Sequence, residues 1–508
     1  MKTIPSGVQG LDEIIAGGFI RPSTMLVAGP AGSGKTTFVM QSLFNAVVEQ
    51  GDVGLFMPTI SEPVAMVNNF MSQYSFYNFE AFEKKRLHYK DLSEVVGENW
   101  KIIIDEIRSI MEQISPKWVV IDPLTVLGYG LSDMEHRQFL NELFATVKGW
   151  DTMVLATGEF TRENLMESPY SYMVDGIIFL GTEEAPCPGS RYAEVLKLRG
   201  KPNIPGRHFF RIEPSGLHIY PRILPTREAV TTLTPSTDAR KSTGVKGYDE
   251  MVGGGFIPGS TNLIAGSAGT GKTVFGLSFI SAGLKKNEKG VVVVFEESPS
   301  KTMRDAEALG IPLTKWFKED KVKILYYPPG DSHPEEVGWG IRNALETWEE
   351  EGEGGEKVRL LFDSMSGFSN MVGDDSRLMT YLSNLDAYLS GRGVTSVFTA
   401  NLPDVMGDFT LGDLRNAMVM DSATILRYVE VESSVNRFLA VLMMKGSDHQ
   451  KDIRQYTVDE GEIQVMEKFH GLEGLLSGSA RKATSTHLTK VLREALPEAQ
   501  RHLFEEKD

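Results

Sequence analysis

Two short segments of the sequence have the residue types and the spacing of a phosphate-binding loop. Residues 29–36 read GPAGSGKT and residues 266–273 read GSAGTGKT, so both match the pattern G-x-x-x-x-G-K-[ST]. Glycines let backbone N–H groups approach phosphate oxygens, and the helix that follows adds the positive end of its dipole. A glycine-rich turn can match this pattern by chance. Two matches that each follow an apolar run and precede a helical pattern favour phosphate binding instead.

The loops predict two sites for ATP with Mg²⁺. Lys35 and Lys272 would bridge the β- and γ-phosphates, whereas the hydroxyls of Thr36 and Thr273 would bind the metal. The loop residues that we expect to contact nucleotide are Gly29, Ala31, Gly32, Ser33, Gly34, Lys35, Thr36, Thr37, Gly266, Ala268, Gly269, Thr270, Gly271, Lys272, Thr273 and Val274.

An aspartate ends an apolar, strand-like run downstream of each loop. Asp122 closes the run VVID, 87 residues after Lys35, and Asp363 closes LLFD, 91 residues after Lys272. An aspartate in this position is often a turn residue or a helix cap. Because both aspartates follow a phosphate loop at matching distances, we interpret them as Walker B ligands of Mg²⁺.

Two adjacent glutamates follow a strand-like run in the second half of the chain. Residues 295–299 read FEESP, and the carboxyl end of a strand in a doubly wound sheet faces the ligand crevice. One of Glu296 and Glu297 could polarise the attacking water, and Glu296 could also complete the metal shell. The alternative is that both glutamates cap the next helix.

The corresponding segment of the first half lacks this pair. When the segments are aligned on the following proline, Ile60 and Ser61 stand where the glutamates should be, and Glu62 is one position late. A slip of one residue along a strand reverses the face of a side chain. The sequence therefore predicts that the first site binds nucleotide but is poorly equipped to hydrolyse it, with Glu62 as the open alternative.

The loops belong to a tandem duplication. Residues 7–38 and 244–275 are identical at 20 of 32 positions without a gap. Strand-like runs alternate with helical periodicity in each half, which favours an α/β fold with a mostly parallel sheet covered by helices on both faces. The expected strands are 25–28, 53–57, 118–121 and 152–156, then 263–265, 291–295, 360–362 and 395–399, with hairpin strands at 192–198 and 438–444 and helices at 38–48 and 137–147.

Length and composition set the outer limits. The 508 residues exceed one compact core, and we expect domains at 1–224 and 241–468, a Pro- and Thr-rich linker at 225–240 and a C-terminal loop and tail at 469–508. The net charge of −16 disfavours nucleic acid and anionic membrane as main partners. The lone Cys187 excludes an intramolecular disulfide, and no run spans a bilayer, so a cytoplasmic location is expected.

Taken together, these motifs resemble the KaiC family of tandem RecA-like ATPases over nearly the whole chain. The resemblance rests on the GxxGxDE…GGGFI segment, both loops, FEESP, FDSMS, KLRG and FHGLEGLLSGSA. It implies two tandem RecA-like P-loop NTPase domains, an ATP-dependent homo-oligomer, hexameric in the family, and active sites built between neighbouring subunits.

The resemblance also assigns residues outside the loops. Lys197, Leu198 and Arg199 would reach the neighbour's ATP in the first ring, and Lys445 stands where the second ring should have an arginine. Lysine is a point charge and not a planar fork, so this exchange is not conservative. Ser72 matches a nucleotide-contacting serine, although an exposed helix serine is the ordinary alternative.

Clock proteins of this family phosphorylate a neighbouring Ser-Thr pair in the second domain. Ala417 and Met418 occupy those positions here, and neither has a hydroxyl. Ser/Thr autokinase activity is therefore left open only for other hydroxyls, such as Thr410 or Ser422.

Three hypotheses follow. The first is an oligomeric Mg²⁺-dependent ATPase that signals its nucleotide state, with the second ring hydrolysing. The second is a nucleotide-gated scaffold with negligible turnover that acts through its tail, where residues 488–496 have helical spacing suited to a protein partner or to packing on the ring. The third is a RecA- or DnaB-like DNA-dependent ATPase, which the absence of a dense Lys/Arg cluster disfavours.

Overall fold

The computed structural model describes residues 3–60, 64–183, 189–225, 239–402, 419–431, 434–459, 462–468, 472–473 and 481–482. The chain divides into two compact units, Met1–Arg222 and Ile223–Asp508. Some residues named in the sequence analysis lie outside the described ranges: Ser61, Glu62, Cys187, Thr410, Ala417, Met418, most of the linker and the expected tail helix at 488–496.

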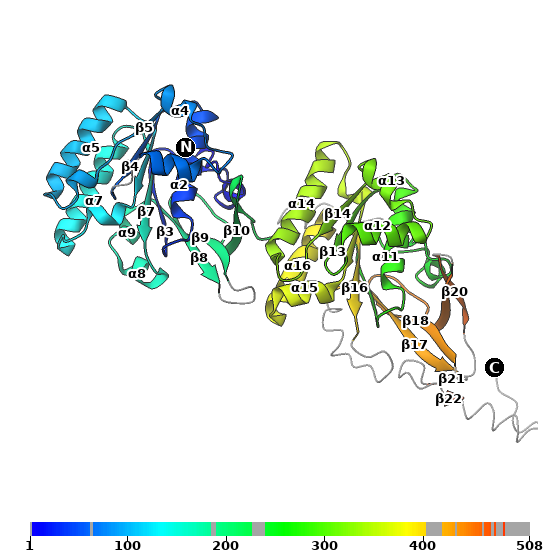
Figure 1. Ribbon diagram of the computed structural model, residues 1–508. Helices are drawn as coiled ribbons and strands as arrows, with labels where there is room; N and C mark the ends of the chain where they lie inside the picture. Colours follow the sequence, from blue (N-terminus) through cyan, green and yellow to red (C-terminus); the bar gives the residue numbers. More distant parts are fainter. Residues whose placement is uncertain are drawn as a thin grey trace, which may run out of the picture. The chain divides into compact units, whose positions relative to one another are not determined.

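The first unit is built on a nine-stranded sheet in the order β11-β10-β9-β8-β3-β7-β6-β4-β5 (Figure 1). Its strands are β3 (Ser23–Gly29), β4 (Gly54–Pro58), β5 (Leu87–Tyr89), β6 (Trp118–Asp122), β7 (Met153–Glu159), β8 (Gly176–Glu183), β9 (Ser190–Leu198), β10 (Arg207–Glu213) and β11 (Gly216–Ile219). Strands β3 to β8 pair in parallel, and β9 to β11 are added antiparallel beside β8. A small pair joins β1 (Thr3–Ile4) to β2 (Phe19–Ile20).

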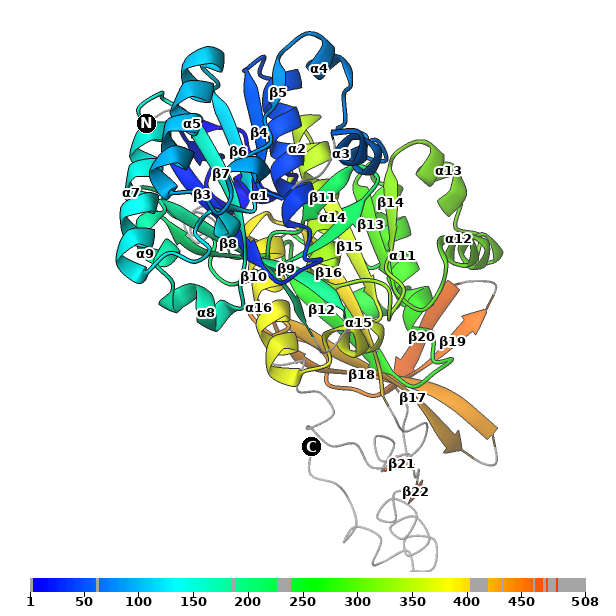
Figure 2. The ribbon, with the colours of Figure 1, turned by 60° about the vertical axis from the view of Figure 1, so that its left-hand side comes forward.

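Helices cover both faces of this sheet because its strands are apolar on both sides. The helices are α1 (Leu11–Ile14), α2 (Lys35–Val48), α3 (Val64–Met71), α4 (Glu80–Glu83), α5 (Trp100–Ile114), α6 (Leu124–Leu127), α7 (Asp133–Lys148), α8 (Arg162–Glu167) and α9 (Tyr170–Met173), with a 3₁₀ turn at Ser93–Val95. Along β3, Met25 and Val27 pack in the core that includes α2, whereas Leu26 and Ala28 pack in the core that includes α5 and α7. Figure 2 shows α7 to the left of β3 and α2 to its right. Alternation along a buried parallel strand thus specifies both layers.

The second unit repeats this topology in the order β14-β13-β15-β16-β12-β17-β18-β19-β20. Its strands are β12 (Thr261–Gly266), β13 (Lys289–Val294), β14 (Val322–Tyr326), β15 (Val358–Asp363), β16 (Thr395–Asn401), β17 (Ser422–Val431), β18 (Ser434–Met444), β19 (Arg454–Asp459) and β20 (Glu462–Lys468), and β21 (Leu472–Glu473) pairs with β22 (Arg481–Lys482). Every strand of the second sheet has a counterpart in the same place in the first.

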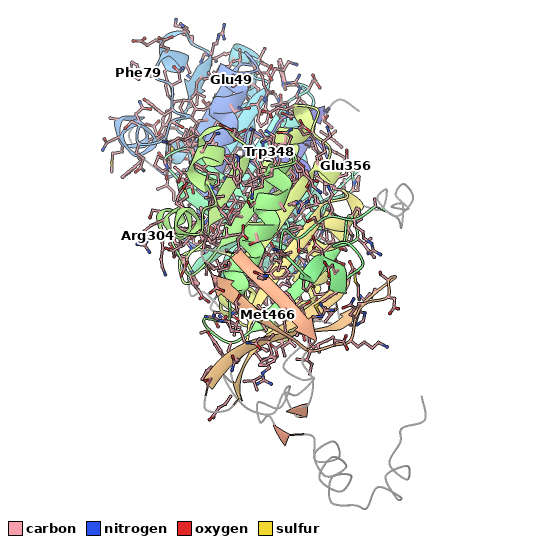
Figure 3. All side chains as sticks on the ribbon, turned by 90° about the vertical axis from the view of Figure 1, so that its right-hand side faces the viewer. Glu49, Phe79, Arg304, Trp348, Glu356 and Met466 are labelled. Carbon is pink, nitrogen blue, oxygen red and sulfur yellow. The ribbon has the colours of Figure 1, made fainter. Side chains whose placement is uncertain are left out.

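Helices again cover both faces of the second sheet. They are α10 (Tyr248–Met251), α11 (Lys272–Leu284), α12 (Pro299–Ala308), α13 (Leu313–Lys318), α14 (Pro334–Glu350), α15 (Met365–Val372) and α16 (Asp375–Gly391), with a 3₁₀ turn at Gly355–Lys357. The core on one face includes α11, and the core on the other includes α14, α15 and α16. Trp348 of α14 is fully buried, in contrast to the exposed Phe79 and Met466 (Figure 3).

These elements confirm the predicted α/β class with mostly parallel sheets, and the predicted hairpin strands lie in β9 and β18. Several predicted strands were too short: the run expected at 152–156 continues to Glu159, and the run expected at 395–399 continues to Asn401. Among the described residues, no helix is both long enough and apolar enough to span a bilayer.

Candidate functional site

Each phosphate loop connects the central strand of its sheet to the first long helix. The loop in the first unit leaves β3 at Gly29, and α2 begins at Lys35, directly after Gly34. Gly34 and its counterpart Gly271 both have φ of 98°, a left-handed conformation that favours glycine. A Cβ atom on Gly34 would also lie 2.9 Å from Cδ1 of Ile212. The sequence therefore folds locally as a tight turn between the strand and the helix.

The loop lysines lie inside these turns. The Lys35 ammonium donates hydrogen bonds to the carbonyl oxygens of Gly29, at 3.1 Å, and Pro30, at 2.8 Å. Lys272 donates to the carbonyl oxygen of Ser267 at 2.8 Å. Burial lowers the pKa of each lysine, and the carboxylates around it oppose that shift. Each ammonium is therefore held by carbonyl oxygens of its own loop, where it would attract a phosphate oxygen.

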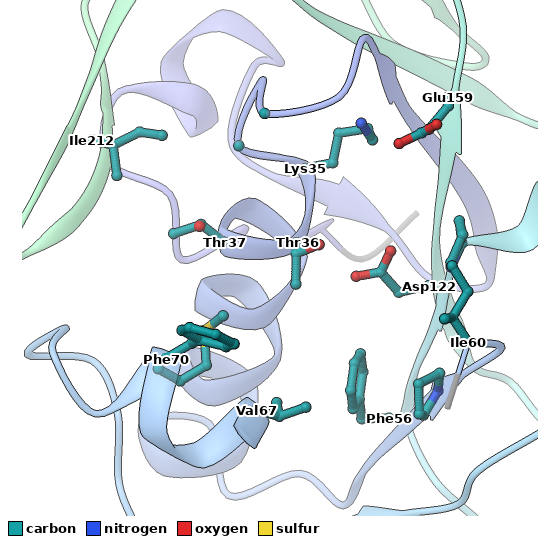
Figure 4. Close-up of a pocket in the computed structure, with 15 residues that line it drawn as sticks. Lys35, Thr36, Thr37, Phe56, Ile60, Val67, Phe70, Asp122, Glu159 and Ile212 are labelled. Atoms are coloured by element: carbon teal, nitrogen blue, oxygen red, sulfur yellow. The ribbon is translucent and has the colours of Figure 1, made fainter. Parts of the chain in front are cut away.

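A half-buried aspartate stands beside the first loop at the end of β6. Burial raises the pKa of Asp122, and hydrogen bonds from Thr157 and Thr36 oppose the rise. Figure 4 shows the Asp122 carboxylate directed at the Thr36 hydroxyl. The two side chains that the sequence proposes as metal ligands are thus brought together.

The second unit reproduces this pair. The Thr273 hydroxyl donates to Oδ2 of Asp363 at 2.7 Å, and Thr399 donates to the other carboxylate oxygen. Burial raises the pKa of Asp363, and the bonds from Thr399 and Thr273 counteract the rise. Asp363 ends β15, as Asp122 ends β6.

These pairs fit Mg²⁺ bound together with a nucleotide. Mg²⁺ prefers oxygen ligands and is commonly held by one or two protein groups, with phosphates and water completing its shell. Each site offers one hydroxyl and one carboxylate next to a phosphate loop. The described residues contain no cluster of three or more His, Cys, Asp or Glu side chains able to hold a metal without such a partner.

The two glutamates of the second unit point to different neighbours. Ser364 donates a 3.3 Å hydrogen bond to Oε1 of Glu296, and the charges of Asp363 and Glu296 counteract the lowering of the Lys272 pKa by burial. Glu297 forms an ion pair with Lys301, one turn along α12. Glu296 therefore lies beside the residue that follows β15, whereas Glu297 is paired with a lysine of α12.

The pairing register places Ile60 where the second unit has Glu296. Pro58 of β4 pairs with Asp122, and Val294 of β13 pairs with Asp363. Two residues beyond these pairs stand Ile60 and Glu296, so the first site has an apolar side chain at this position. Ile60 is 53 % exposed and lines the site cavity.

A cavity of about 480 Å³ opens at the first loop (Figure 4). Its lining residues are Gly32, Gly34, Lys35, Thr36, Thr37, Phe56, Pro58, Ile60, Val67, Phe70, Met71, Asp122, Pro123, Glu159 and Ile212. Glu159 was not among the sequence candidates, because the predicted strand ended at Ala156. The signal that would have found it is an acidic residue at the end of the strand beside the phosphate loop.

The cations of the KLRG segment do not line the cavity of their own unit. Lys197 donates to the carbonyl oxygen of Ser171 at 3.0 Å. Arg199 donates to the carbonyl oxygen of Tyr172 at 3.2 Å and lies 3.6 Å from a carboxylate oxygen of Asp175. Leu198, between them, ends β9.

Ser72 does not line this cavity either, and Lys445 belongs to the second unit. The Lys445 ammonium is 3.8 Å from Oδ1 of Asp421, the residue of the second unit that corresponds to Asp175. Ser72 follows α3 and donates to the carbonyl oxygen of Asn69 at 2.9 Å, while its neighbours Phe70 and Met71 line the cavity.

A family model described as "ATPase: KaiC" matches residues 4–223 and again residues 241–470. The chain belongs to the KaiC family of ATPases. The two matches cover both phosphate loops and both aspartate-ended strands, so the tandem RecA-like organisation and an ATPase assignment apply to the chain as a whole.

Curated KaiC relatives resemble the chain along most of its length. The circadian clock oscillator protein KaiC of Thermostichus vulcanus is 26 % identical over 510 residues, which covers 97 % of this chain and 95 % of the relative. KaiC of Parathermosynechococcus lividus is 28 % identical over 486 residues, covering 93 % and 87 %, and KaiC of Synechococcus elongatus is 26 % identical over 501 residues, covering 96 % and 94 %.

Proposed function

We propose that this KaiC-family chain is an Mg²⁺-dependent ATPase that forms ATP-dependent homo-oligomeric rings, hexameric as in the family, and signals its nucleotide state. The second unit hydrolyses ATP, and the first mainly binds it and supports assembly. One observation carries this proposal. Pro58 and Val294 are the residues that pair with the two Walker B aspartates. Two positions after them, the first unit has Ile60 and the second has Glu296.

In the second unit, the chain's own groups divide the work of hydrolysis. Lys272 leaves the Ser267 carbonyl to hold the γ-phosphate, and Glu296, beside it, orients the attacking water and accepts its proton. Thr273 and Asp363 would hold Mg²⁺, which would supply neutralisation of the phosphate charge.

The cations that stabilise the transition state come from the neighbouring subunit. Lys197 and Arg199 lie outside the cavity of their own unit, which fits a role in trans. A cation supplied in trans accelerates phosphoryl transfer by stabilising charge on the γ-phosphate. Lys445 supplies a weaker, single-point contact in the second ring.

The output is a nucleotide-dependent state of the ring and not a clock-type phosphorylation cycle. Ala417 and Met418 have no hydroxyl group to phosphorylate. Ser422 is buried and donates a 2.7 Å hydrogen bond to Asn262, so it is a poor substitute acceptor. A protein partner that binds the C-terminal tail would detect the nucleotide state of the ring. The protein acts in the cytoplasm and needs neither nucleic acid nor membrane.

The test is the double substitution Glu296→Gln/Glu297→Gln, which keeps side-chain size and removes both charges. We expect ATP turnover to fall by about 100-fold or more, since a positioned general base contributes about 10²–10⁴-fold. Size-exclusion chromatography with ATP should still show rings. The matched control, Glu350→Gln/Glu351→Gln, changes two adjacent exposed glutamates at the end of α14 and should leave turnover unchanged.

Three outcomes would contradict the proposal. Unchanged turnover in the Glu296→Gln/Glu297→Gln variant would exclude the second unit as the main catalyst. Rings without measurable turnover in the wild type would favour a nucleotide-gated scaffold. Strong stimulation of turnover by single-stranded DNA would favour a DNA-dependent ATPase.

A further inference from the structure

The first site lacks the glutamate pair that follows β13 in the second unit, but it contains a carboxylate on the other side of the Walker B strand. Strand β6, which ends at Asp122, lies between β4 and β7 in the sheet. Ile60 follows β4, whereas Glu159 is the last residue of β7. The two positions therefore flank Asp122. The first site lacks a carboxylate at one of them and has one at the other.

Glu159 is held beside the start of the phosphate loop by main-chain pairing. It is the register partner of Gly29, and the N–H group of Phe160 donates a 3.2 Å hydrogen bond to the Gly29 carbonyl oxygen. This same carbonyl accepts a bond from the Lys35 ammonium. The main chain next to Glu159 and the lysine that would contact the γ-phosphate are thus hydrogen-bonded to the same carbonyl oxygen.

The Glu159 side chain faces the site and is available. It lines the same cavity as Lys35, Thr36 and Asp122, and its carboxylate points toward the Lys35 ammonium (Figure 4). It is exposed, and within the described part of the chain it has no hydrogen bond or ion pair of its own. A structural carboxylate would be expected to have a fixed partner, whereas one that handles water needs a free oxygen.

The second unit has no carboxylate at the equivalent position. Gly266 pairs with Asn401 in β16 as Gly29 pairs with Glu159 in β7. Asn401 is neutral and cannot accept a proton from water. Among the described residues that flank the Walker B aspartates, the carboxylates are Glu296 and Glu297 after β13 in the second unit and Glu159 at the end of β7 in the first.

From this arrangement we infer that Glu159 is the catalytic carboxylate for slow ATP hydrolysis at the first site. A water oxygen forms a bond to the γ-phosphorus, and a proton of that water passes to the Glu159 carboxylate. The bond from the γ-phosphorus to the β,γ-bridging oxygen breaks, and its electron pair leaves with ADP. Inorganic phosphate is the second product, and the Glu159 proton returns to solvent. This inference rests on the proposed ATPase function and extends it to the first site.

The test isolates the first site in a Glu296→Gln/Glu297→Gln background and compares Glu159→Gln, Glu159→Asp and a matched control. Single-turnover cleavage of γ-labelled ATP and the affinity for a fluorescent ATP analogue are both measured. We expect Glu159→Gln to slow cleavage at least about 30-fold without weakening affinity, and Glu159→Asp to restore part of the rate. The control Glu163→Gln changes an exposed glutamate in the first turn of α8 and should change neither quantity.

Cleavage that stays within about threefold in Glu159→Gln would overturn the inference, as would a background with no cleavage at all. A parallel loss of affinity and rate would also overturn it, because Glu159 would then serve only to hold Lys35. None of these results bears on the second site. If the Glu296→Gln/Glu297→Gln protein instead keeps the steady-state turnover of the wild type, the proposed division of labour between the units is contradicted. The comparison of the Glu159 variants would still test the inference about the first site.

Discussion

The two nucleotide sites share a scaffold and differ in side chains at the ends of their strands. Both combine a loop lysine with a threonine hydroxyl that is hydrogen-bonded to a half-buried aspartate. They differ at Ile60 against Glu296 and at Glu159 against Asn401. Strand interiors are constrained by packing on both faces, whereas a residue that enters the crevice changes without disturbing the core. Fold and catalytic competence are therefore encoded in separate residues of the same strands.

A second difference concerns how the phosphate loop is held. In the second unit, Tyr456 donates a 2.5 Å hydrogen bond to the Thr270 carbonyl oxygen, and Tyr428 donates a 2.6 Å bond to that of Gly269. Both tyrosines pair with Arg437 across neighbouring strands.

The corresponding row of the first unit lacks these hydroxyl contacts. It reads Thr182, Arg191 and Phe210 across β8, β9 and β10. Phenylalanine has no hydroxyl, and the Thr182 side chain is shorter than tyrosine. The loop of the second unit is therefore the more firmly held of the two, in keeping with its proposed catalytic role.

The largest expected effect comes from moving the glutamate pair into the first unit. Ile60→Glu/Ser61→Glu in a Lys272→Ala background should raise first-site turnover about tenfold or more, since it supplies the missing general base. Ile60 is half exposed, so a charge there carries a small desolvation cost. Phosphate release measures the gain.

The matched control for this transfer is Ile60→Gln/Ser61→Gln, which adds similar bulk without charge. An equal gain in the control would show that polarity or shape limits the first site. No gain in the glutamate variant would show that the two units differ in more than this pair.

A smaller effect is expected when the second loop loses its buried hydroxyl. Tyr456→Phe reproduces Phe210 of the first unit and should cost about 1 kcal/mol, or about fivefold in ATP affinity at the second site. Nucleotide titration in a Lys35→Ala background measures this loss. Tyr428→Phe should cost less, because its hydroxyl is partly exposed and water can replace it. Equal affinities in wild type and Tyr456→Phe would exclude the proposed role of this hydroxyl.

The sequence was sufficient for the fold because its signals were local and repeated. Glycine spacing predicted the turns at Gly34 and Gly271, and apolar runs predicted the central strands and both Walker B aspartates. The repeat at residues 7–38 and 244–275 made each assignment support the other.

Other site residues needed the pairing of distant strands. Glu159 was missed because only the register with Gly29 shows that β7 runs past Ala156 to the loop. Tyr456 lies 186 residues from its partner Thr270, and no local pattern connects them. The sequence also left open which of the adjacent glutamates polarises the water, whereas in the structure Ser364 donates to Glu296 and Glu297 pairs with Lys301. Side-chain partners of this kind are set by tertiary packing.

The measurement that tests the division of labour most directly is phosphate release by Lys35→Ala and Lys272→Ala, at concentrations where sizing shows rings. We expect the Lys272→Ala protein to lose most of its ATP turnover and still to form rings with ATP. Lys35→Ala should assemble less readily with ATP but keep most of its turnover once rings form. Turnover that survives Lys272→Ala and is lost in Lys35→Ala would contradict it, and the first unit would then be the main ATPase.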